Sequence, residues 1–223
     1  MNFAKLLARL NQTTVRYDIG MGGRPELTAQ DIAAALGLVQ PGIGRDLMEM
    51  IWWPEGAKLR IAYLNAVLTE MQLVEHNRRE QAMYSALAGV AVGPLGEERI
   101  RAHSAYSHAH SRRWPAWIKR LDPLEVAEGY EGIRATVLLE LARPRHCQTC
   151  EGRGEIFKRD LVVACARCEG SGTREFGPTW RAEQMGMTEQ AFKKTWEGPY
   201  LWLLDRLRGE LEKAENSLRG ALA

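Results

Sequence analysis

All four cysteines of this 223-residue chain lie in one short stretch, as two Cys-x-x-Cys pairs. The pairs are Cys147 with Cys150 and Cys165 with Cys168. A Cys-x-x-Cys turn lets two thiolates approach one ion, and two such turns supply the closed tetrahedral sulfur shell of a structural zinc site. We therefore predict one structural Zn²⁺ ion bound by all four cysteines. Two disulfides, or four unrelated thiols, are the alternatives.

Each cysteine pair is followed by the same glycine pattern, so the chain contains the repeat Cys-x-x-Cys-x-Gly-x-Gly twice. A chain that wraps a metal must turn sharply and direct backbone N–H groups at the sulfur atoms. Glycine permits the positive φ that such turns require. The glycines of the two repeats are Gly152, Gly154, Gly170 and Gly172.

The segment between the two pairs predicts a short β-hairpin. Fourteen residues separate Cys150 from Cys165, which is close to what two short strands and a turn need. The strand-forming residues are Ile156, Phe157, Val162 and Val163.

The segment after the second pair predicts a helix-turn-helix that begins near Pro178. The turn would contain Gly186 in positive φ, and Thr188 would cap the second helix. This places Glu189, Gln190, Lys193 and Lys194 outward and Ala191 and Phe192 inward. In such a motif the start of the second helix meets base edges, and lysines further along meet phosphates. An ordinary pair of core helices joined by a glycine turn is the alternative.

Helical spacing of apolar residues dominates the rest of the chain. It predicts helices within 55–88 and at 124–142, and a long amphipathic helix from Pro199 with a leucine stripe that includes Leu201 and Leu204. We expect a mainly α protein with a small zinc-bound β-hairpin inserted before a helix-turn-helix. The expected parts are an N-terminal segment 1–27, a helical region 28–142, a zinc-binding module 143–177, and a helix-turn-helix with C-terminal helix 178–223.

Composition is that of an ordinary soluble globular protein, with 45% hydrophobic and 26% charged residues. The formal net charge of +2 favours no class of partner. No segment approaches the roughly 20 apolar residues that span a bilayer, and the N-terminus lacks a signal-peptide pattern. We therefore expect no membrane partner and a reducing cytoplasm, where clustered cysteines more often bind metal than form disulfides.

The sequence shows no nucleophile elbow, P-loop, dinucleotide glycine signature or paired-carboxylate pattern. A closed four-cysteine site also leaves no open coordination position for chemistry. We therefore do not expect an enzyme. The segment 97–120 combines histidines, arginines and the tryptophans Trp114 and Trp117. We expect its histidines on a solvated or partner-facing surface and its tryptophans in the core, and its role stays open.

The cysteine–glycine repeat resembles the zinc repeats of DnaJ-type co-chaperones. Those proteins carry four copies of the repeat and a J domain with a His-Pro-Asp signature. This chain has two copies and no such tripeptide. The resemblance implies the metal site and not the chaperone activity.

Several further motifs are collinear with one family. They are the two cysteine half-sites with their hairpin, Thr173-Arg-Glu-Phe-Gly-Pro, Trp180-Arg-Ala-Glu-Gln-Met, Thr195-Trp-Glu-Gly-Pro-Tyr-Leu-Trp, and the earlier Asp31-Ile-Ala-Ala-Ala-Leu-Gly-Leu-Val-Gln-Pro-Gly-Ile-Gly. Together they resemble the antitermination protein Q of lambda-like phages. The similarity runs from about residue 28 to 218 and is most specific over 147–208. The chain differs from that family in its longer middle segment.

This resemblance implies a transcription antitermination factor that acts in the cytoplasm of a bacterial host. Such a factor recognises a DNA element in a phage late promoter and loads onto paused RNA polymerase. It contacts the β-subunit flap and the σ factor, and it makes the polymerase read through pauses and terminators. Nascent RNA is a further candidate partner, for residues 112–120.

Carried onto this chain, the resemblance implies that the four cysteines hold zinc and that the helix at 188–196 reads DNA. It places Lys193, Lys194 and Arg181 on phosphates. The candidate DNA-binding residues are Arg181, Thr188, Glu189, Gln190, Lys193 and Lys194. A zinc-containing helix-turn-helix regulator of initiation, or a DnaJ-like zinc chaperone module, are the alternatives.

Overall fold

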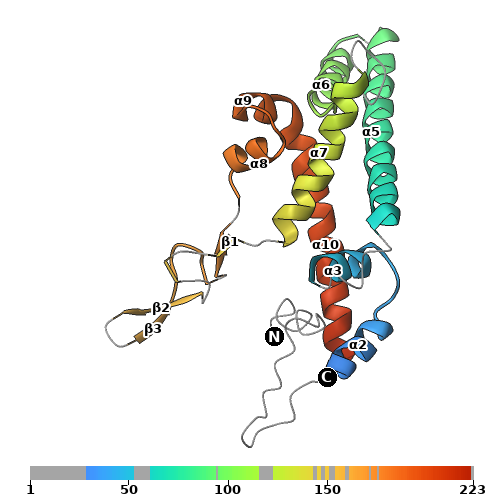
Figure 1. Cartoon of the computed structure of the whole chain (residues 1–223). Helices are drawn as coiled ribbons and strands as arrows, with labels where there is room; N and C mark the ends of the chain where they lie inside the picture. Colours follow the sequence, from blue (N-terminus) through green and yellow to red (C-terminus); the bar gives the residue numbers. More distant parts are fainter. Residues whose placement is uncertain are drawn as a thin grey trace, which may run out of the picture. The chain divides into compact units, whose positions relative to one another are not determined.

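The computed structural model describes residues 29–52, 61–93, 95–115, 123–142, 145–146, 149–150, 154–158, 161–170, 172–174 and 176–221. The chain is mainly helical, with a small two-stranded hairpin near a cysteine cluster, as the sequence predicts (Figure 1). It divides into a first unit, residues 1–111 with 201–223, and a second unit, residues 112–200. The predicted segment 1–27 lies outside the described residues, and the sequence-based domain boundaries stay a prediction.

The described residues of the first unit form helices. They are α2 (Ala29–Leu38), α3 (Ile43–Trp52), α5 (Ile61–Ala91), α6 (Glu97–Ser111) and most of α10 (Glu197–Ala221). Aliphatic side chains form the core of this unit, among them Leu36, Leu47, Met48, Leu64, Leu68, Leu204, Leu207 and Leu218. Gly44 of α3 lies directly against the α10 backbone, where an added Cβ atom would collide with the carbonyl oxygen of Glu210. A glycine at this position lets the two helices approach closely.

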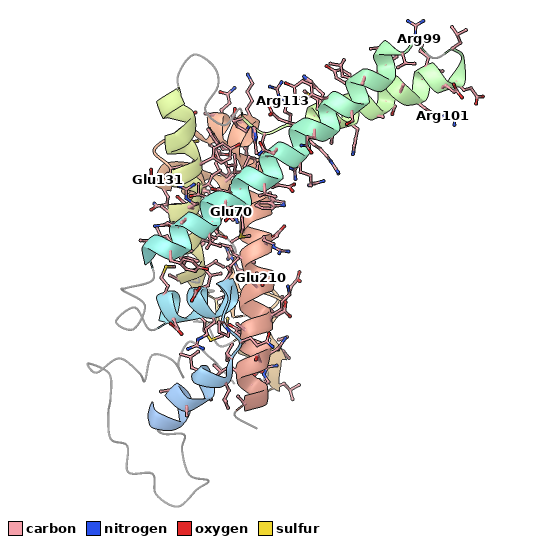
Figure 2. All side chains as sticks on the ribbon, turned by 90° about the vertical axis from the view of Figure 1, so that its right-hand side faces the viewer. Glu70, Arg99, Arg101, Arg113, Glu131 and Glu210 are labelled. Atoms are coloured by element: carbon pink, nitrogen blue, oxygen red, sulfur yellow. The ribbon has the colours of Figure 1, made fainter. Side chains whose placement is uncertain are left out.

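Helices α5 and α6 form an antiparallel hairpin within the first unit (Figures 1 and 2). The chain reverses at Gly93 and Gly96, whose φ angles of 71° and 60° suit glycine. None of the side chains of α6 is buried, and Figure 2 shows Arg99 and Arg101 toward the far end of the hairpin. This agrees with the solvated surface that the sequence predicts for its histidines. No helix among the described residues is long and apolar enough to cross a membrane.

The second unit contains the hairpin and the helices around it. Its elements are α7 (Pro123–Ala142), β1 (Arg145–His146), β2 (Glu155–Lys158), β3 (Leu161–Ala164), β4 (Thr173–Arg174), α8 (Pro178–Gln184) and α9 (Glu189–Ala191), followed by a π-helical segment (Phe192–Trp196) that leads into α10. Strand β2 pairs antiparallel with β3, and β1 pairs antiparallel with β4. The predicted helix at 124–142 and the predicted hairpin are confirmed.

The second helix of the predicted helix-turn-helix does not end before Pro199. It passes through the π-helical segment into α10 without a loop, and the Glu197 N–H bonds to the Phe192 carbonyl oxygen five residues back. Proline lacks an N–H and crowds the preceding α-helical turn, so it usually marks a helix boundary. Here the segment that precedes it is π-helical and the helix continues. The predicted leucine stripe also shifts, because Leu201 is 37% exposed while Leu203 and Leu204 are buried.

Aromatic residues make up much of the core of the second unit. The Tyr130 ring packs edge-on against Trp196, with ring centroids 5.3 Å apart, and lies 6.4 Å from the ring of Trp114. A Cβ atom at Gly129 would collide with the Trp196 ring, so a glycine is needed for this close packing. Trp114 is buried, as the sequence predicts, and Trp117 lies outside the described residues.

Candidate metal centre

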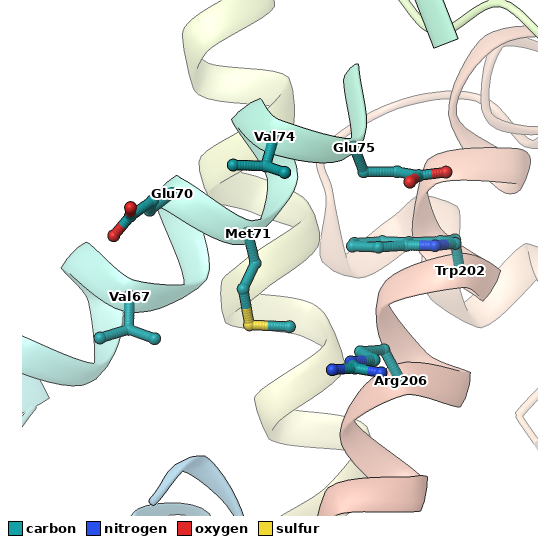
Figure 3. Close-up of a pocket in the computed structure, with 7 residues that line it drawn as sticks. All are labelled: Val67, Glu70, Met71, Val74, Glu75, Trp202 and Arg206. Atoms are coloured by element: carbon teal, nitrogen blue, oxygen red, sulfur yellow. The ribbon is translucent and has the colours of Figure 1, made fainter. Parts of the chain in front are cut away.

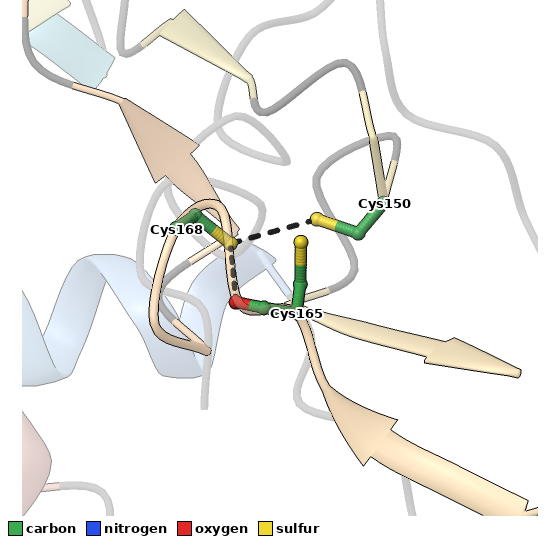
Figure 4. A group of neighbouring side chains, drawn as sticks. All are labelled: Cys150, Cys165 and Cys168. Carbon is green, nitrogen blue, oxygen red and sulfur yellow. Dashed lines mark hydrogen bonds between the residues drawn. The ribbon is translucent and has the colours of Figure 1, made fainter. Parts of the chain in front are cut away.

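Three cysteines come together beside the β2–β3 hairpin (Figure 4). The Sγ atoms of Cys150, Cys165 and Cys168 all lie within 4.8 Å of one another, and all three side chains are buried. The Sγ atoms of Cys150 and Cys168 are 3.7 Å apart. Because a Zn–S bond is about 2.3 Å long, two sulfur ligands of one tetrahedral ion stand about 3.8 Å apart. The cluster therefore has the chemistry and the dimensions of a metal centre.

The fourth predicted ligand, Cys147, lies outside the described residues. A disulfide S–S bond is about 2.05 Å long. The separation of 3.7 Å therefore means that Cys150 and Cys168 are not bonded to each other. The structure thus brings together three of the four predicted ligands, in a cluster that could hold a metal ion such as zinc.

The last glycine of each repeat donates a backbone hydrogen bond to the second cysteine of its own pair. The Gly154 N–H donates to Cys150 Sγ, and the Gly172 N–H donates to Cys168 Sγ, both at 3.3 Å. Gly154 and Gly172 have positive φ angles of 80° and 74°. Such N–H groups stabilise negative charge on sulfur, and the thiolate is the form that binds metals. The sequence-based expectation is confirmed for these two glycines.

The two half-sites interlock at Gly154. Its carbonyl oxygen accepts a hydrogen bond from the Cys165 N–H at 2.7 Å. A Cβ atom at Gly154 would collide with the carbonyl oxygen of Gly170 from the other repeat. Gly170 itself has a φ of 84°, whereas Gly152 lies outside the described residues. The backbones of the two half-sites are therefore in direct contact, and the conformation of each depends on that of the other.

Strands β1 and β4 join the two ends of the cysteine-containing segment. Arg145 is opposite Arg174, and His146 is opposite Thr173, in an antiparallel pair. The segment from β1 to β4, residues 145–174, is called the cysteine module below. Its ends lie side by side, so the chain leaves α7 and returns to α8 through one short ladder.

The turn after α8 has the backbone geometry that the sequence predicts, which a DNA-binding helix-turn-helix and an ordinary helix pair share. Gly186 has a φ of 68°, and the Thr188 hydroxyl oxygen accepts a hydrogen bond from the Ala191 N–H at 3.2 Å. Phe192 is fully buried, as expected. The inward orientation expected for Ala191 is wrong, because that residue is exposed. The buried face of this helix contains Phe192 and Trp196, which are four residues apart and therefore lie on the same side. Ala191 lies outside that face.

Four predicted DNA-binding residues line one shallow depression at the start of the second helix, namely Glu189, Gln190, Lys193 and Lys194. The Glu189 carboxylate accepts a hydrogen bond from the Thr179 hydroxyl at 2.6 Å and pairs with the Lys193 ammonium at 2.6 Å. The Lys193 and Thr179 hydrogen bonds lower the pKa of Glu189, and the Glu189 hydrogen bond raises the pKa of Lys193. Lys193 thus offsets the negative charge of Glu189, while Gln190 and Lys194 are exposed.

Arg181, which the resemblance places on phosphates, is buried instead. Its guanidinium donates to both carboxylate oxygens of Glu140, at 2.9 Å each, and the two side chains are only 6% and 3% exposed. The Tyr200 hydroxyl donates to the same carboxylate at 2.8 Å. We therefore leave Arg181 out of the DNA-contact set, because its donors face Glu140 and not the surface.

These three residues form a buried polar cluster that sequence reasoning missed. The guanidinium of Arg181 also lies over the Tyr200 ring, 5.1 Å from its centroid. Burial, and then the hydrogen bond to Glu140, raise the pKa of Tyr200 far above its usual value. The available sequence signal was the position of Glu140, a charged residue among the apolar residues of α7.

A separate groove of about 450 Å³ lies between α5 and α10 within the first unit (Figure 3). Its lining residues are Val67, Glu70, Met71, Val74, Glu75, Trp202 and Arg206. The Glu75 carboxylate is held by Arg78 and Arg79 at 2.7 Å, and the hydrogen bond from Arg78 is the main cause of its lowered pKa. The groove shares no residue with the predicted metal or DNA site.

No protein-family model matches the chain, and no curated protein is significantly similar to it. The site itself is a cluster of three buried cysteines beside a β-hairpin, followed by two helices joined at a glycine turn.

Proposed function

We propose that this protein is a transcription antitermination factor of the kind represented by phage antitermination protein Q. It would bind a DNA element in a late promoter, load onto paused RNA polymerase and make the enzyme read through pauses and terminators. One observation carries the proposal. Gln190 and Lys194 are exposed near the start of the second helix, whose N-terminus is capped by Thr188.

The cysteine module serves this function as a scaffold. In our proposal Cys147 joins the three clustered cysteines, so that four thiolates hold one Zn²⁺ ion. A site closed in this way stabilises a fold and leaves no position for a reacting group. The module lies directly before α8 in the chain, so it would fix the point at which the chain enters the DNA-reading helix pair, while the helices keep their own aromatic core.

In our proposal the exposed residues make different kinds of contact with DNA. A glutamine amide can form two hydrogen bonds to adenine in the major groove, so Gln190 is the proposed base contact. Lys194 would contact a phosphate. The Thr188 hydroxyl oxygen is used as the helix cap, but its O–H can still donate to a phosphate. Pairing of Glu189 with Lys193 reduces the repulsion between that carboxylate and DNA.

A factor that acts on polymerase also needs a protein-binding surface. Around the turn of the α5–α6 hairpin, Val92, Leu95 and Ile100 are 86%, 83% and 71% exposed. Contiguous exposed apolar patches are typical of protein interaction sites, and we propose that these side chains form one. This surface supports a role in which the protein binds polymerase as well as DNA.

DNA binding is the first test. Duplexes would be selected from a randomised pool by the wild-type protein and titrated by fluorescence anisotropy. We expect Gln190→Ala to weaken binding by about 1–3 kcal/mol and to relax selectivity at one base pair. Lys194→Ala should weaken binding to all duplexes and reduce the salt slope by about 1. Lys213→Ala, at an exposed lysine of α10, is the control and should change neither quantity.

Transcription by bacterial RNA polymerase is the second test. The template would carry the selected duplex at a promoter with a promoter-proximal pause and a downstream terminator. We expect readthrough to rise only when both the duplex and the protein are present. Reduced initiation without readthrough would instead favour the helix-turn-helix regulator. Suppression of client aggregation without any dependence on template would favour the chaperone module.

A further inference from the structure

Within the second unit, the buried cluster of Glu140, Arg181 and Tyr200 joins α7, α8 and the first turn of α10. Glu140 lies in the last turn of α7, Arg181 in α8, and Tyr200 in the first turn of α10. Each pair in the cluster has a direct contact: two hydrogen bonds between Arg181 and Glu140, one between Tyr200 and Glu140, and the guanidinium over the Tyr200 ring. The three side chains therefore lock one another's positions.

The cluster also connects to the second helix of the turn motif. Phe192, in the π-helical segment after α9, packs edge-on against the Tyr200 ring with centroids 5.5 Å apart. Thr179 of α8 bonds to Glu189 at the start of that helix. The helix that carries the exposed Gln190 is thus held on one side of this residue by α8, through Glu189, and on the other by Tyr200, through Phe192.

We propose that Glu140, Arg181 and Tyr200 are positioning residues that set the angle of the DNA-reading helix and so determine its sequence selectivity. The inference rests on the proposed function. Base contacts need a helix placed within a fraction of an ångström, whereas phosphate contacts tolerate small displacements. Loss of the cluster should therefore lower affinity for the selected duplex and leave nonspecific binding nearly unchanged.

Stability alone does not explain such a cluster. Replacement of a buried ion pair by apolar residues of similar volume is often neutral or stabilising. A planar guanidinium that forms two parallel bonds does, however, fix direction in a way that apolar contacts do not. A variant with an apolar cluster can therefore separate positioning from folding.

The experiment uses the full chain with its metal and measures the ratio of dissociation constants for the selected duplex and a scrambled duplex. The main variant combines Glu140→Leu, Arg181→Met and Tyr200→Phe. We expect its metal content and urea midpoint to match the wild type and its selectivity ratio to fall about tenfold or more, roughly the loss of one base contact. The matched control is Arg45→Met with Glu49→Leu, which removes a part-buried ion pair in the first unit and should leave the ratio unchanged.

Two milder variants keep the test valid if the triple variant does not fold. Tyr200→Phe removes one hydroxyl, and Arg181→Lys keeps the charge but loses the two-pronged geometry. Each should lower the ratio about threefold while nonspecific binding stays constant. A folded variant with an unchanged ratio would overturn the positioning role. If the wild-type protein itself fails to discriminate between duplexes, the proposed function falls first, and the inference falls with it.

Discussion

The cysteine module and the helices that flank it belong to one compact unit but are held together differently. The buried cluster of the module consists of Cys150, Cys165 and Cys168, with Ile156 packed against it. The flanking helices instead bury large aromatic side chains, among them Tyr130, Phe192, Trp196 and Tyr200. Burial of one such side chain contributes a few kcal/mol. Within the described residues of the module, the buried cluster has only four members, too few to offset the entropy of ordering the chain around them. The module should depend on metal, and the helices should not.

Removal of the proposed zinc ion gives the largest expected effect. Structural zinc contributes apparent free energies of about 10–16 kcal/mol in small zinc modules. A chelator should therefore unfold the cysteine module while the helix content of the chain stays nearly constant. Amide exchange would show protection lost over β2 and β3 but kept in α7 and α8. Equal loss of protection in both regions would show that the helices depend on the metal as much as the cysteine module does.

The reverse perturbation is Phe192→Ala in the helical part. Phe192 is fully buried, and removal of such a ring costs about 3–5 kcal/mol. We expect a lower urea midpoint for the helices, followed by tryptophan fluorescence, with an unchanged metal-to-protein ratio before the transition. Release of metal in the folded variant would show that the two regions are coupled more tightly than their separate clusters suggest.

Replacement of Gly154 or Gly186 by alanine gives a matched pair of variants with smaller expected losses of stability. Gly154 and Gly186 have φ angles of 80° and 68°, so alanine is strained at both positions. Only Gly154 is also crowded, since no atom lies within 4 Å of the position of a Cβ atom at Gly186. Gly186→Ala should cost about 1–2 kcal/mol of helix stability. Gly154→Ala should additionally weaken metal binding, measured by competition with a chromogenic chelator, whereas Gly186→Ala should not.

The smallest predicted effect concerns alkaline pH. Burial and the bond to Glu140 raise the pKa of Tyr200, so the folded state holds its phenolic proton more tightly than the unfolded state. The resulting stability is fully present below about pH 10, the unfolded pKa, and is lost as pH rises above it. An absorbance titration of the tyrosines should show one that ionises late, together with unfolding. Tyr200→Phe should remove that late phase.

The parts that sequence could predict are those set by neighbours in the chain. The clustering of Cys150, Cys165 and Cys168, and the hairpin beside them, follow from local spacing. So do the positive φ of Gly186 and the Thr188 cap. The Glu140–Arg181 pair could not be predicted in this way, because 41 residues separate its members and an isolated charge in a helix pattern usually faces solvent. The resemblance placed Arg181 on phosphates, and no nearby residue in the sequence indicated its distant partner Glu140. The continuous helix through Pro199 was missed because proline normally marks a helix boundary, whereas here the helix continues from the π-helical segment into α10.

The ladder between β1 and β4 makes the cysteine module a candidate for transplantation. Because His146 and Thr173 are paired, the segment between them enters and leaves through two adjacent antiparallel strands. Any β-hairpin in another protein offers the same pair of attachment points. Residues 145–174 could thus replace a surface hairpin turn in an unrelated host and give it a compact metal-dependent appendage. In the same way, a two-residue type I′ turn could close the ladder here and yield a shorter chain with the helices of the second unit intact.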